Sequence, residues 1–468
     1  MIDRWHFRSR ARGRGTALLL LFGALVAQPI WAGDSLIWRK GTDRNHDRVD
    51  ASIGKWSLPK LLGEISAATG WKIYLEPGTA HTVSTTFTNL PAKDALSLLL
   101  GDVSCAPIIE NNTVSKLLVF RTSRDQATQL IRPAERSLTR PSGRPLRNEL
   151  VVTLKPGAKI DALAKRLGAK VVGRSDPLNA YRLQFEDAGA AKDAQSELGD
   201  ASEVDSVDNN FPVFRPQTPE EWTGAAPSIN LVPKAVGSSG GLVVGLIDTA
   251  VQQTGSPVDG FLLPSLSVAG EASTLQNSPT HGTSMWETIL RGMTMAYGEG
   301  DATAVRILPV DVYGDNSATT TFEVAKGIYT AVNNGAMIIN LSLGSEGDSS
   351  LVRNVVKSAH DQGVLFFAAA GNEPVTAPTY PAAYPEVVAV TAQDSKGNIA
   401  SYANRGDFVD VGAPGTTFVS FKDRTWLVLG TSASTAYASG MAAALAETSK
   451  KPLSQVEATI RGTLAVKP

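Results

Sequence analysis

The chain has 468 residues, of which 43% are hydrophobic, and a formal net charge of −1 at pH 7. This length suits roughly two to four domains, and the near-zero charge gives no indication of nucleic-acid binding. Cys105 is the only cysteine, which excludes an internal disulfide and any metal site built from several cysteines. It stands among small and apolar residues, which indicates a buried hydrophobe rather than a reactive thiol.

Residues 1–32 show the three parts of a secretory signal peptide. Five arginines precede an apolar run over 16–27, and small residues follow up to Ala32. The alternative is a short membrane anchor, but the run is too short to cross a hydrocarbon core of about 30 Å comfortably. We therefore expect cleavage near Ala27 or Ala32, export of the chain, and a periplasmic or extracellular location.

Residues 49–122 predict a small α+β domain with the order βαββαβ. The expected segments are 49–53, a helix from Ser57 to Gly70, 71–75, 83–87, a helix from Pro91 to Gly101, and 117–120. The segments 57–70 and 89–96 resemble the small N-terminal domain of secretins and TonB-dependent receptors. That resemblance implies docking to an envelope partner. The alternative is an unrelated half-buried module with the same periodicity.

Residues 123–147 predict an exposed linker, because they hold six arginines and three prolines and show no apolar period. A basic patch for phosphate or lipid is the alternative, but no aromatic residues are interleaved with the arginines.

Residues 148–214 predict a second small α+β domain, built from two β-α-β passes. The expected segments are strand 150–154, helix 160–167, strands 171–172 and 181–185, helix 190–198 and strand 204–210. A proline-rich hinge from Arg215 to Ser228 follows.

Residues 229–468 alternate strands and helices, which predicts a parallel α/β sheet with its strands buried on both faces. The expected strands are 243–247, 304–312, 337–344, 364–369, 387–391 and 409–411, and the expected helices include 322–333 and 351–362.

Four polar residues of this region stand in frames rich in glycine or small residues: Asp248, His281, Asn372 and Ser432. Each alone has an ordinary reading, as a turn residue, a loop residue or a helix N-cap. Together they are the parts of an acyl-transfer site, in which serine is the nucleophile and histidine takes its proton. The aspartate would hold the histidine tautomer, and the amide would donate to the oxyanion.

The chain order Asp248, His281, Ser432 and the flanking residues resemble the subtilisin-like serine proteases (subtilases, peptidase S8 family) from about Gly241 onward. The resemblance implies a subtilisin-like parallel sheet with helices on both faces, preceded here by the two small α+β domains. It also implies an endopeptidase with these three residues as its triad and Asn372 in the oxyanion hole. No cofactor is required for this chemistry, whereas structural calcium, or any other metal, is left open.

The resemblance assigns further residues to substrate binding: Ser342, Leu343, Gly344, Ala370, Gly371 and Thr379. The first three match a strand edge that pairs with the substrate backbone. Thr379 stands where the family often has glycine at the floor of the primary pocket, and the bond before Pro381 matches a cis bond. A threonine there predicts a preference for small or medium apolar side chains over phenylalanine or tyrosine.

Residues 148–214 resemble the subtilase propeptide, which implies a zymogen that inhibits and then processes itself between Arg215 and Ser228. Ala250, Trp286 and Ala436 depart from the family motifs but remove no reacting group. The alternative function is therefore a catalytically weak, subtilase-derived scaffold or regulator of envelope proteins. The expected partners are protein or peptide substrates, the chain's own propeptide and an envelope partner of residues 49–122, with no nucleic acid.

Overall fold

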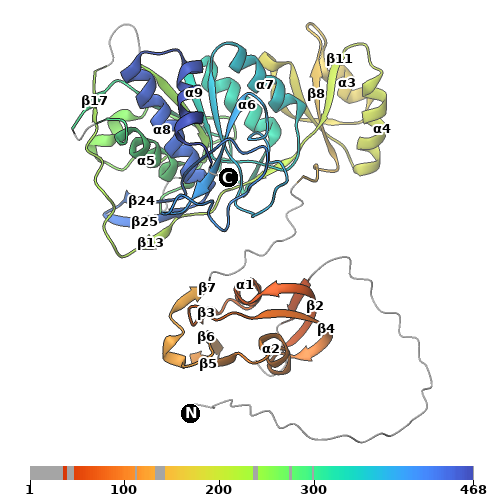
Figure 1. Ribbon diagram of the computed structural model, residues 1–468. Helices are drawn as coiled ribbons and strands as arrows, with labels where there is room; N and C mark the ends of the chain where they lie inside the picture. The colour runs from red at the N-terminus through yellow and green to blue at the C-terminus, as the bar shows by residue number, and fades with distance from the viewer. Residues whose placement is uncertain are drawn as a thin grey trace, which may run out of the picture. The chain divides into compact units, whose positions relative to one another are not determined.

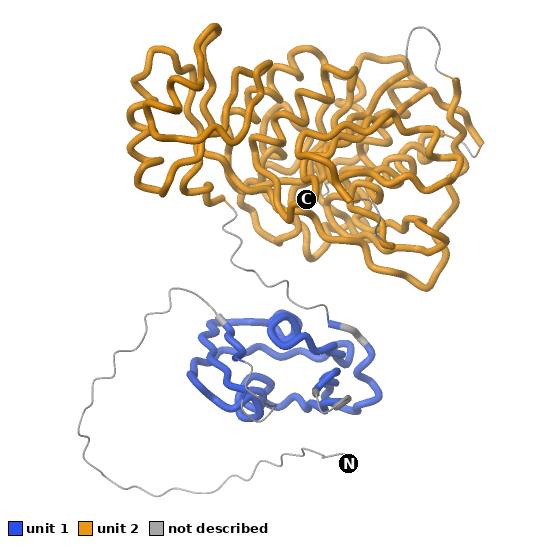
Figure 2. Tube along the Cα trace, turned by 180° about the vertical axis from the view of Figure 1, so that it is seen from behind, with its two compact units in different colours: residues 1–140 blue, residues 141–468 orange. Residues whose placement is uncertain are grey.

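The computed structural model describes residues 35–39, 47–110, 113–131, 143–235, 241–273, 277–297 and 300–466. The predicted signal peptide lies outside these residues. The chain divides into two units, residues 1–140 and 141–468, each with its own core (Figure 2). Within the described ranges, the helices are all too short or too polar to cross a membrane.

The first unit holds two sheets and two helices. Its elements are β1 (Ser35–Arg39), β2 (Arg48–Ser57), α1 (Leu58–Thr69), β3 (Lys72–Leu75), β4 (Thr82–Pro91), α2 (Ala92–Leu100), β5 (Ser104–Glu110), β6 (Thr113–Phe120), the 3₁₀ turn η1 (Arg124–Gln126) and β7 (Gln129–Ile131). The sheet orders are β1-β2-β4 and β5-β6-β3-β7. The helix α1 ends at Gly70, whose φ of 80° suits glycine.

Three strands of this unit were not predicted. The strand β1 lies before the predicted domain, β5 contains Cys105, and β7 falls inside the predicted linker and pairs with β3. The unit's strands thus run beyond residues 49–122 on both sides. The half-buried Cys105 packs against the core, and burial raises the pKa of its thiol to about 11, so the thiol stays protonated at neutral pH.

The second unit begins with a domain of one antiparallel sheet, which we call the antiparallel domain (residues 149–209). Its elements are β8 (Glu149–Leu154), α3 (Ile160–Arg166), β9 (Lys170–Ser175), the 3₁₀ turn η2 (Asp176–Leu178), β10 (Ala180–Gln184), α4 (Ala188–Gly199) and β11 (Val204–Asn209). The sheet order is β11-β8-β10-β9. Leu150 and Val152 face α3 and α4, whereas Val151 packs into the core of the following domain.

The following domain is a sheet of seven parallel strands. In spatial order they are β16 (Leu266–Ser267), β18 (Arg306–Asp311), β15 (Val243–Asp248), β20 (Ala336–Leu341), β21 (Leu365–Ala369), β22 (Val387–Gln393) and β23 (Val411–Pro414). The helices α6 (Thr321–Asn333) and α7 (Ser350–Asp361) cover one face. The helices α5 (His281–Thr294), α8 (Thr431–Ser449) and α9 (Leu453–Thr463) cover the other (Figure 1).

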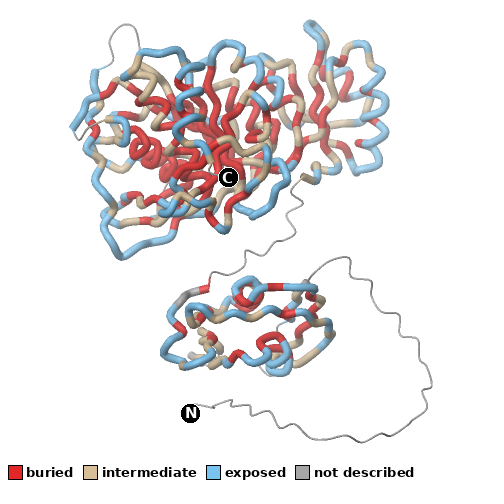
Figure 3. Tube along the Cα trace, in the orientation of Figure 1, coloured by how far each residue is buried: buried red, intermediate tan, exposed pale blue. Residues whose placement is uncertain are grey.

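Burial is concentrated along this sheet and the helix faces against it (Figure 3). The predicted α/β class, with a parallel sheet between two helical layers, is confirmed.

Several short strands that follow the antiparallel domain along the chain pair with strands of the second domain of this unit. They are β12 (Pro212–Phe214) on β19 (Ala318–Thr320), β13 (Glu220–Trp222) on β25 (Arg424–Leu429), and β14 (Val232–Pro233) on β17 (Ala302–Thr303). The 3₁₀ turn η3 (Pro257–Phe261) packs against β14. The strand β25 also pairs with β24 (Thr416–Phe421), and neither was predicted. Their two-residue turn places Lys422 and Asp423 at φ of 50° and 59°, the geometry that matches strand twist in tight hairpins.

Candidate active site

Asp248 and His281 form a buried pair at the carboxyl edge of the parallel sheet. Asp248 is the last residue of β15 and His281 is the first residue of α5, and they are 0% and 4% exposed. His281 Nδ1 lies 2.8 Å and 2.9 Å from the two carboxylate oxygens. The Thr249 N–H also donates to Asp248 Oδ1, at 2.7 Å. Because Nδ1 faces the carboxylate, the histidine is held in the tautomer that leaves Nε2 as an acceptor.

Glycine at position 282 makes this pairing sterically feasible. A Cβ at Gly282 would stand 2.1 Å from the Thr249 carbonyl oxygen. The start of α5 can therefore approach the end of β15 this closely only because residue 282 has no side chain. The Gly282 N–H donates to Thr249 Oγ1 at 2.8 Å, and Thr280 caps the helix through Thr283 N. The His-Gly-Thr segment therefore positions the imidazole at the start of α5, beside the end of β15.

Ser432 is the second residue of α8, in the turn where N–H groups have no partner within the helix. Its side chain is 8% exposed, and Oγ donates to the Ser342 carbonyl at 3.2 Å. Ser342 Oγ in turn donates to the Ser432 carbonyl at 3.1 Å. Among the described residues, no hydrogen bond joins Ser432 to His281. Such contacts are often long before substrate binds.

The two helices that carry His281 and Ser432 pack backbone to backbone. A Cβ at Gly440 would lie 2.0 Å from the Ile289 carbonyl oxygen, and one at Gly292 would lie 2.3 Å from the Tyr437 carbonyl oxygen. These contacts set the distance between α5 and α8. The structure thus brings Asp248, His281 and Ser432 to one edge of the sheet.

Asn372 follows β21 and turns its amide toward the first turn of α8. Its Oδ1 accepts from the Thr431 N–H at 2.8 Å and from Thr431 Oγ1 at 3.0 Å, and Thr431 Oγ1 accepts from the Gly371 N–H at 3.2 Å. With the oxygen held this way, the amide nitrogen is the end available to a ligand. This is the orientation that an oxyanion donor requires.

The predicted substrate-binding residues lie on neighbouring segments. Leu343 and Ala370 are buried, and Ser342 serves the helix contact described above. A Cβ at Gly344 would stand 2.8 Å from the Thr379 methyl group, so these two residues are in direct contact. Ser345 bridges to Tyr380, and the Tyr380–Pro381 bond is cis, as the resemblance implied.

Asn404 is a residue of this site that sequence reasoning did not find. It is buried, and its backbone N–H donates to the Gly371 carbonyl at 2.9 Å. Its Oδ1 accepts from the Glu373 N–H at 2.8 Å, while its Nδ2 donates to Thr379 Oγ1 at 3.2 Å. Asn404 therefore fixes the residues on both sides of Asn372, together with Thr379. No sequence signal identifies it, because Gly371, Glu373 and Thr379 are all more than twenty residues away along the chain.

A second buried carboxyl group stands beside the pair. Asp311 ends β18 opposite Asp248 and accepts from the N–H groups of Tyr313 and Gly314. Burial raises the pKa of Asp311 and the Asp248 carboxylate adds to that rise, while these N–H groups and the Arg215 guanidinium oppose it. The carboxyl groups of Asp311 and Asp248 thus lie side by side at the ends of neighbouring strands, at the edge of the sheet that holds His281.

Two of the departures from the family motifs, Trp286 and Ala436, are core residues. Trp286 and Ala436 are fully buried in the core that α5 and α8 share, and the Trp286 indole N–H has no hydrogen-bond partner among the described residues. Neither side chain stands among the reacting groups.

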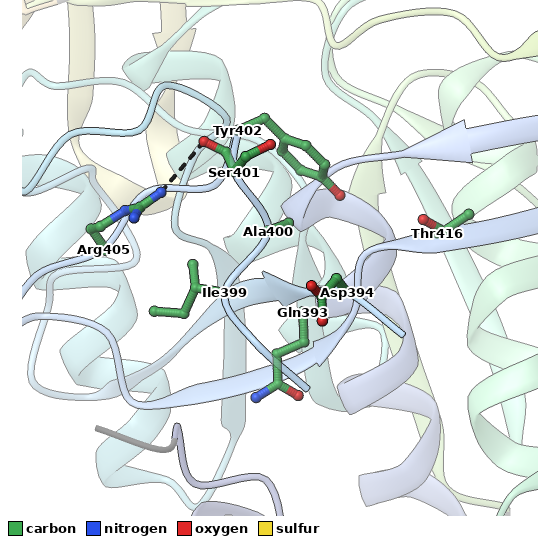
Figure 4. A pocket seen from close by; sticks show the side chains of 8 residues that line it. All are labelled: Gln393, Asp394, Ile399, Ala400, Ser401, Tyr402, Arg405 and Thr416. Carbon is green, nitrogen blue, oxygen red and sulfur yellow. Dashed lines mark hydrogen bonds between the residues drawn. The ribbon is translucent and has the colours of Figure 1, made fainter. Parts of the chain in front are cut away.

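A separate pocket of about 510 Å³ lies on the loop that carries Asn404 (Figure 4). Its lining includes Asp394, Tyr402 and Arg405, and the Arg405 guanidinium donates to the Ser401 carbonyl at 3.4 Å. No predicted site residue lines it. In the described part of the chain, no group of three or more acidic, histidine or cysteine side chains is arranged to hold a metal ion.

Two family descriptions match the chain. Residues 239–466 match the subtilase family, and residues 132–210 match the fervidolysin N-terminal prodomain. The second match covers the whole antiparallel domain, which we now call the prodomain.

Three curated relatives are each similar to just under half of the chain. Thermitase of Thermoactinomyces vulgaris is 33% identical over 231 residues, which are 49% of this chain and 82% of thermitase. A thermophilic serine proteinase of Bacillus sp. strain AK1 is 34% identical over 211 residues, 44% of this chain and 53% of that protein. Minor extracellular protease Epr of Bacillus subtilis is 31% identical over 231 residues, 48% of this chain and 35% of that protein. The chain thus spans most of thermitase but about half or less of the other two.

Solved structures agree in fold. A mutant of the epidermin leader peptide processing serine protease of Staphylococcus aureus has a TM-score of 0.53 and 16% identity, covering 67% of this chain and 92% of that one. Fervidolysin of Fervidobacterium pennivorans, a keratinolytic enzyme, has a TM-score of 0.50 and 20% identity, covering 65% and 55%. Taken with the thermitase match, these findings identify the chain as a member of the subtilase family, a subtilisin-like serine protease with an N-terminal prodomain.

Proposed function

We propose that the protein is an exported serine endopeptidase that hydrolyses peptide bonds through Asp248, His281 and Ser432 and is made as a self-processing zymogen. The observation that carries the proposal is the buried Asp248–His281 pair at the sheet edge to which α8 brings Ser432. Export is supported by the signal-like residues 1–32 and by an extracellular relative.

In the reaction, Ser432 Oγ attacks the substrate carbonyl carbon while His281 Nε2 takes its proton. The Asp248 carboxylate holds Nδ1–H and stabilises the imidazolium. The Asn372 amide nitrogen and the backbone at the start of α8 donate to the oxyanion. His281 then passes the proton to the leaving amine, and water hydrolyses the acyl-enzyme to release the carboxylate and regenerate Ser432.

The prodomain supports the zymogen part of the proposal through two helix caps. The Asp208 carboxylate accepts from Ser349 Oγ at 2.9 Å and from the Leu351 N–H at 3.1 Å at the start of α7. Asn210 Oδ1 accepts from Thr321 Oγ1 and the Phe322 N–H at the start of α6. A carboxylate at a helix N-terminus is favourable by about 0.3–1 kcal/mol at exposed sites and by more when partly buried. These bonds hold the prodomain on the domain of the seven-stranded parallel sheet, which we call the protease domain.

A fluorophosphonate probe tests the activity against the alternative of a catalytically weak scaffold. We expect the processed wild-type protein to be labelled at Ser432, because an activated serine oxygen attacks the phosphorus of such probes, displaces fluoride and becomes phosphonylated. The Ser432→Ala variant is the control and should stay unlabelled. A folded, processed wild-type protein without label would favour the scaffold. The docking role expected for residues 49–122 stays a prediction.

The substrate preference is tested at Thr379. Its methyl group contacts Gly344 and its hydroxyl is held by Asn404, so the side chain narrows the space between these segments. We expect peptides with Ala or Leu at the cleaved position to have a higher kcat/KM than the Phe peptide. Thr379→Gly should shift the preference toward Phe by about 1–3 kcal/mol for each methylene of misfit relieved.

The exposed Thr376 of the same loop provides a control for this substitution. Thr376→Gly removes an equal side chain and should leave the ranking unchanged. If the wild-type kcat/KM for the Phe peptide is about tenfold higher than for the Ala and Leu peptides, Thr379 does not restrict the pocket and its assignment there is wrong.

A further inference from the structure

The chain on either side of residues 216–219 is held by two different parts of the second unit. Upstream, β12 lies antiparallel on β19, with Val213 opposite Thr319 and only 2% exposed. The Phe214 carbonyl accepts from the Tyr313 hydroxyl at 3.1 Å. Phe211 packs so closely on the chain that a Cβ at Gly347 would stand 2.1 Å from its ring. This segment is therefore fixed up to Phe214.

The direction of β12 carries the chain toward the reacting groups. Beyond Phe214, the Arg215 N–H donates to the Ser317 carbonyl at 2.9 Å and its guanidinium donates to the Gly314 carbonyl. The loop that holds Gly314 begins at Val312, whose N–H donates to the Asp248 carbonyl at 3.0 Å. Arg215 thus lies against the loop that adjoins Asp248.

The buried cluster that contains Val213 also includes residues next to Ser342. Val213 belongs to the same buried cluster as Leu343. Leu343 follows Ser342, whose carbonyl accepts from Ser432 Oγ. Pro216 thus follows Arg215, which is bound to the loop beside Asp248, at the edge of the sheet where Asp248, His281 and Ser432 gather.

Downstream, the chain from Glu220 onward is anchored on the protease domain alone. The strand β13 pairs with β25, beside β24 (Figure 1), and the Ala226 N–H donates to Thr425 Oγ1 at 3.1 Å. Arg291 Nη1 donates to the Pro227 carbonyl at 2.7 Å, and Arg291 is paired with Glu287 in the buried part of α5. These contacts are independent of the prodomain.

Between the two anchored segments lie Pro216, Gln217, Thr218 and Pro219, outside any strand. Gln217 and Thr218 are exposed, whereas Pro219 is buried at the entry to β13. In the peptide bonds before Pro216 and Pro219, the leaving nitrogen belongs to a proline ring and carries no hydrogen. The ring also restricts the backbone conformation of the residue before it. The two bonds that flank Gln217 are the remaining ones with an ordinary leaving amine and exposed neighbours.

Resting on the proposed activity, we infer that the chain processes itself at one of the two bonds flanking Gln217, Pro216–Gln217 or Gln217–Thr218. Ser432 Oγ forms an ester with the carbonyl carbon of residue 216 or 217, and the C–N bond to the next residue breaks. The proton from Ser432 passes through His281 to the leaving nitrogen. One water then hydrolyses the ester. The protease domain starts at Gln217 or Thr218, and the prodomain ends with a carboxylate on the preceding residue.

The test uses the full chain expressed in a host without proteases. Amino-terminal labelling and intact mass of the earliest product should give a new N-terminus at Gln217 or Thr218, and Ser432→Ala should stay uncut. The double variant Gln217→Pro/Thr218→Pro turns every bond from 215 to 219 into a bond before proline, and its loss of full-length chain should slow by about tenfold or more. The matched control, Thr223→Pro/Ala225→Pro, places two prolines in exposed positions past β13 and should be cut at the wild-type rate.

The outcomes separate this inference from the proposed function. A first N-terminus at any other residue, or unchanged processing of the Gln217→Pro/Thr218→Pro protein, overturns the inference. If the wild-type chain hydrolyses an added peptide but stays whole, the processing site is wrong while the proposed function stands. If it neither processes itself nor hydrolyses the peptide, the proposed function fails. Thermal unfolding checks that the proline variants fold, and the wild-type N-terminus decides the matter without them.

Discussion

Ser432→Ala is expected to lower kcat for peptide hydrolysis by roughly 10⁶-fold, the magnitude known for removal of the nucleophile in subtilisin. The fold should survive, because the substitution removes one hydroxyl whose hydrogen bond to the Ser342 carbonyl contributes a net of about 0.5–1.5 kcal/mol. The measurement is kcat on a chromogenic peptide, with the thermal unfolding midpoint recorded beside it. Because the proposed self-processing of the zymogen needs the same serine, the variant is best assayed after an added protease has removed the prodomain.

Ser434 offers a matched control two residues along α8. Its hydroxyl is fully buried and donates to the Ala413 carbonyl at 2.9 Å, so Ser434→Ala removes a similar bond from the same helix. We expect Ser434→Ala to lose comparable stability while it keeps its activity. Near-normal turnover by Ser432→Ala would show that the nucleophile has been misassigned.

His281→Ala is expected to abolish hydrolysis as completely as Ser432→Ala does, and the double variant should be little worse than either single one. The two residues act on the same proton, so once one is absent the other contributes almost nothing. His281→Ala should also be the less stable single variant, because it leaves the buried Asp248 carboxylate without the hydrogen bond from Nδ1, a loss of about 1–3 kcal/mol. Fully additive losses in kcat would argue against a coupled triad.

Asn372→Ala is expected to lower kcat by about 10²–10³-fold with little change in KM, because the amide nitrogen stabilises charge that develops only in the transition state. The substitution also removes the oxygen that caps Thr431 N, so a stability loss of about 0.5–2 kcal/mol should accompany it. Steady-state kinetics at several peptide concentrations separate the two effects.

The control for Asn372 is Asn398→Ala, which removes an exposed amide that bonds only locally, to Asp394. It should leave both kcat and KM unchanged. An Asn372→Ala protein whose KM rises while kcat holds would place this amide in ground-state binding and exclude it from the oxyanion hole.

Several long elements of the fold, among them α1, α3 and β15, follow from local chemistry and were predicted. The helices α1 and α3 show apolar residues at helical spacing, and glycines follow at 70 and 168. The strands β15, β20 and β21 are unbroken apolar runs, as strands buried on both faces must be. The unpredicted strands β1, β5, β7, β13, β24 and β25 are short, partly polar or at sheet edges, so their pairing partners determine them more than their own periodicity does.

The hairpin β24–β25 shows the alternation of apolar residues that is typical of paired strands. Its two strands alternate apolar residues around the pair Lys422-Asp423, where the chain turns with positive φ at both positions. Lysine is uncommon in such turns, which favour asparagine and glycine, so the sequence did not stand out.

The sequence by itself determined the order of Asp248, His281 and Ser432 and the small residues around them, because residue types and their order are properties of the chain alone. The contact for which Gly282 is needed, with Thr249 thirty-three residues away, appears only in the fold. Only the tertiary structure decided that Asn404 holds both neighbours of Asn372, that the Ser342 carbonyl receives the Ser432 hydroxyl, and that β12 lies on β19. These contacts join residues far apart in the chain. The order of strands in the sheet, rather than any local pattern, brings them together, since each side chain satisfies its polar groups with whatever partner the fold places beside it.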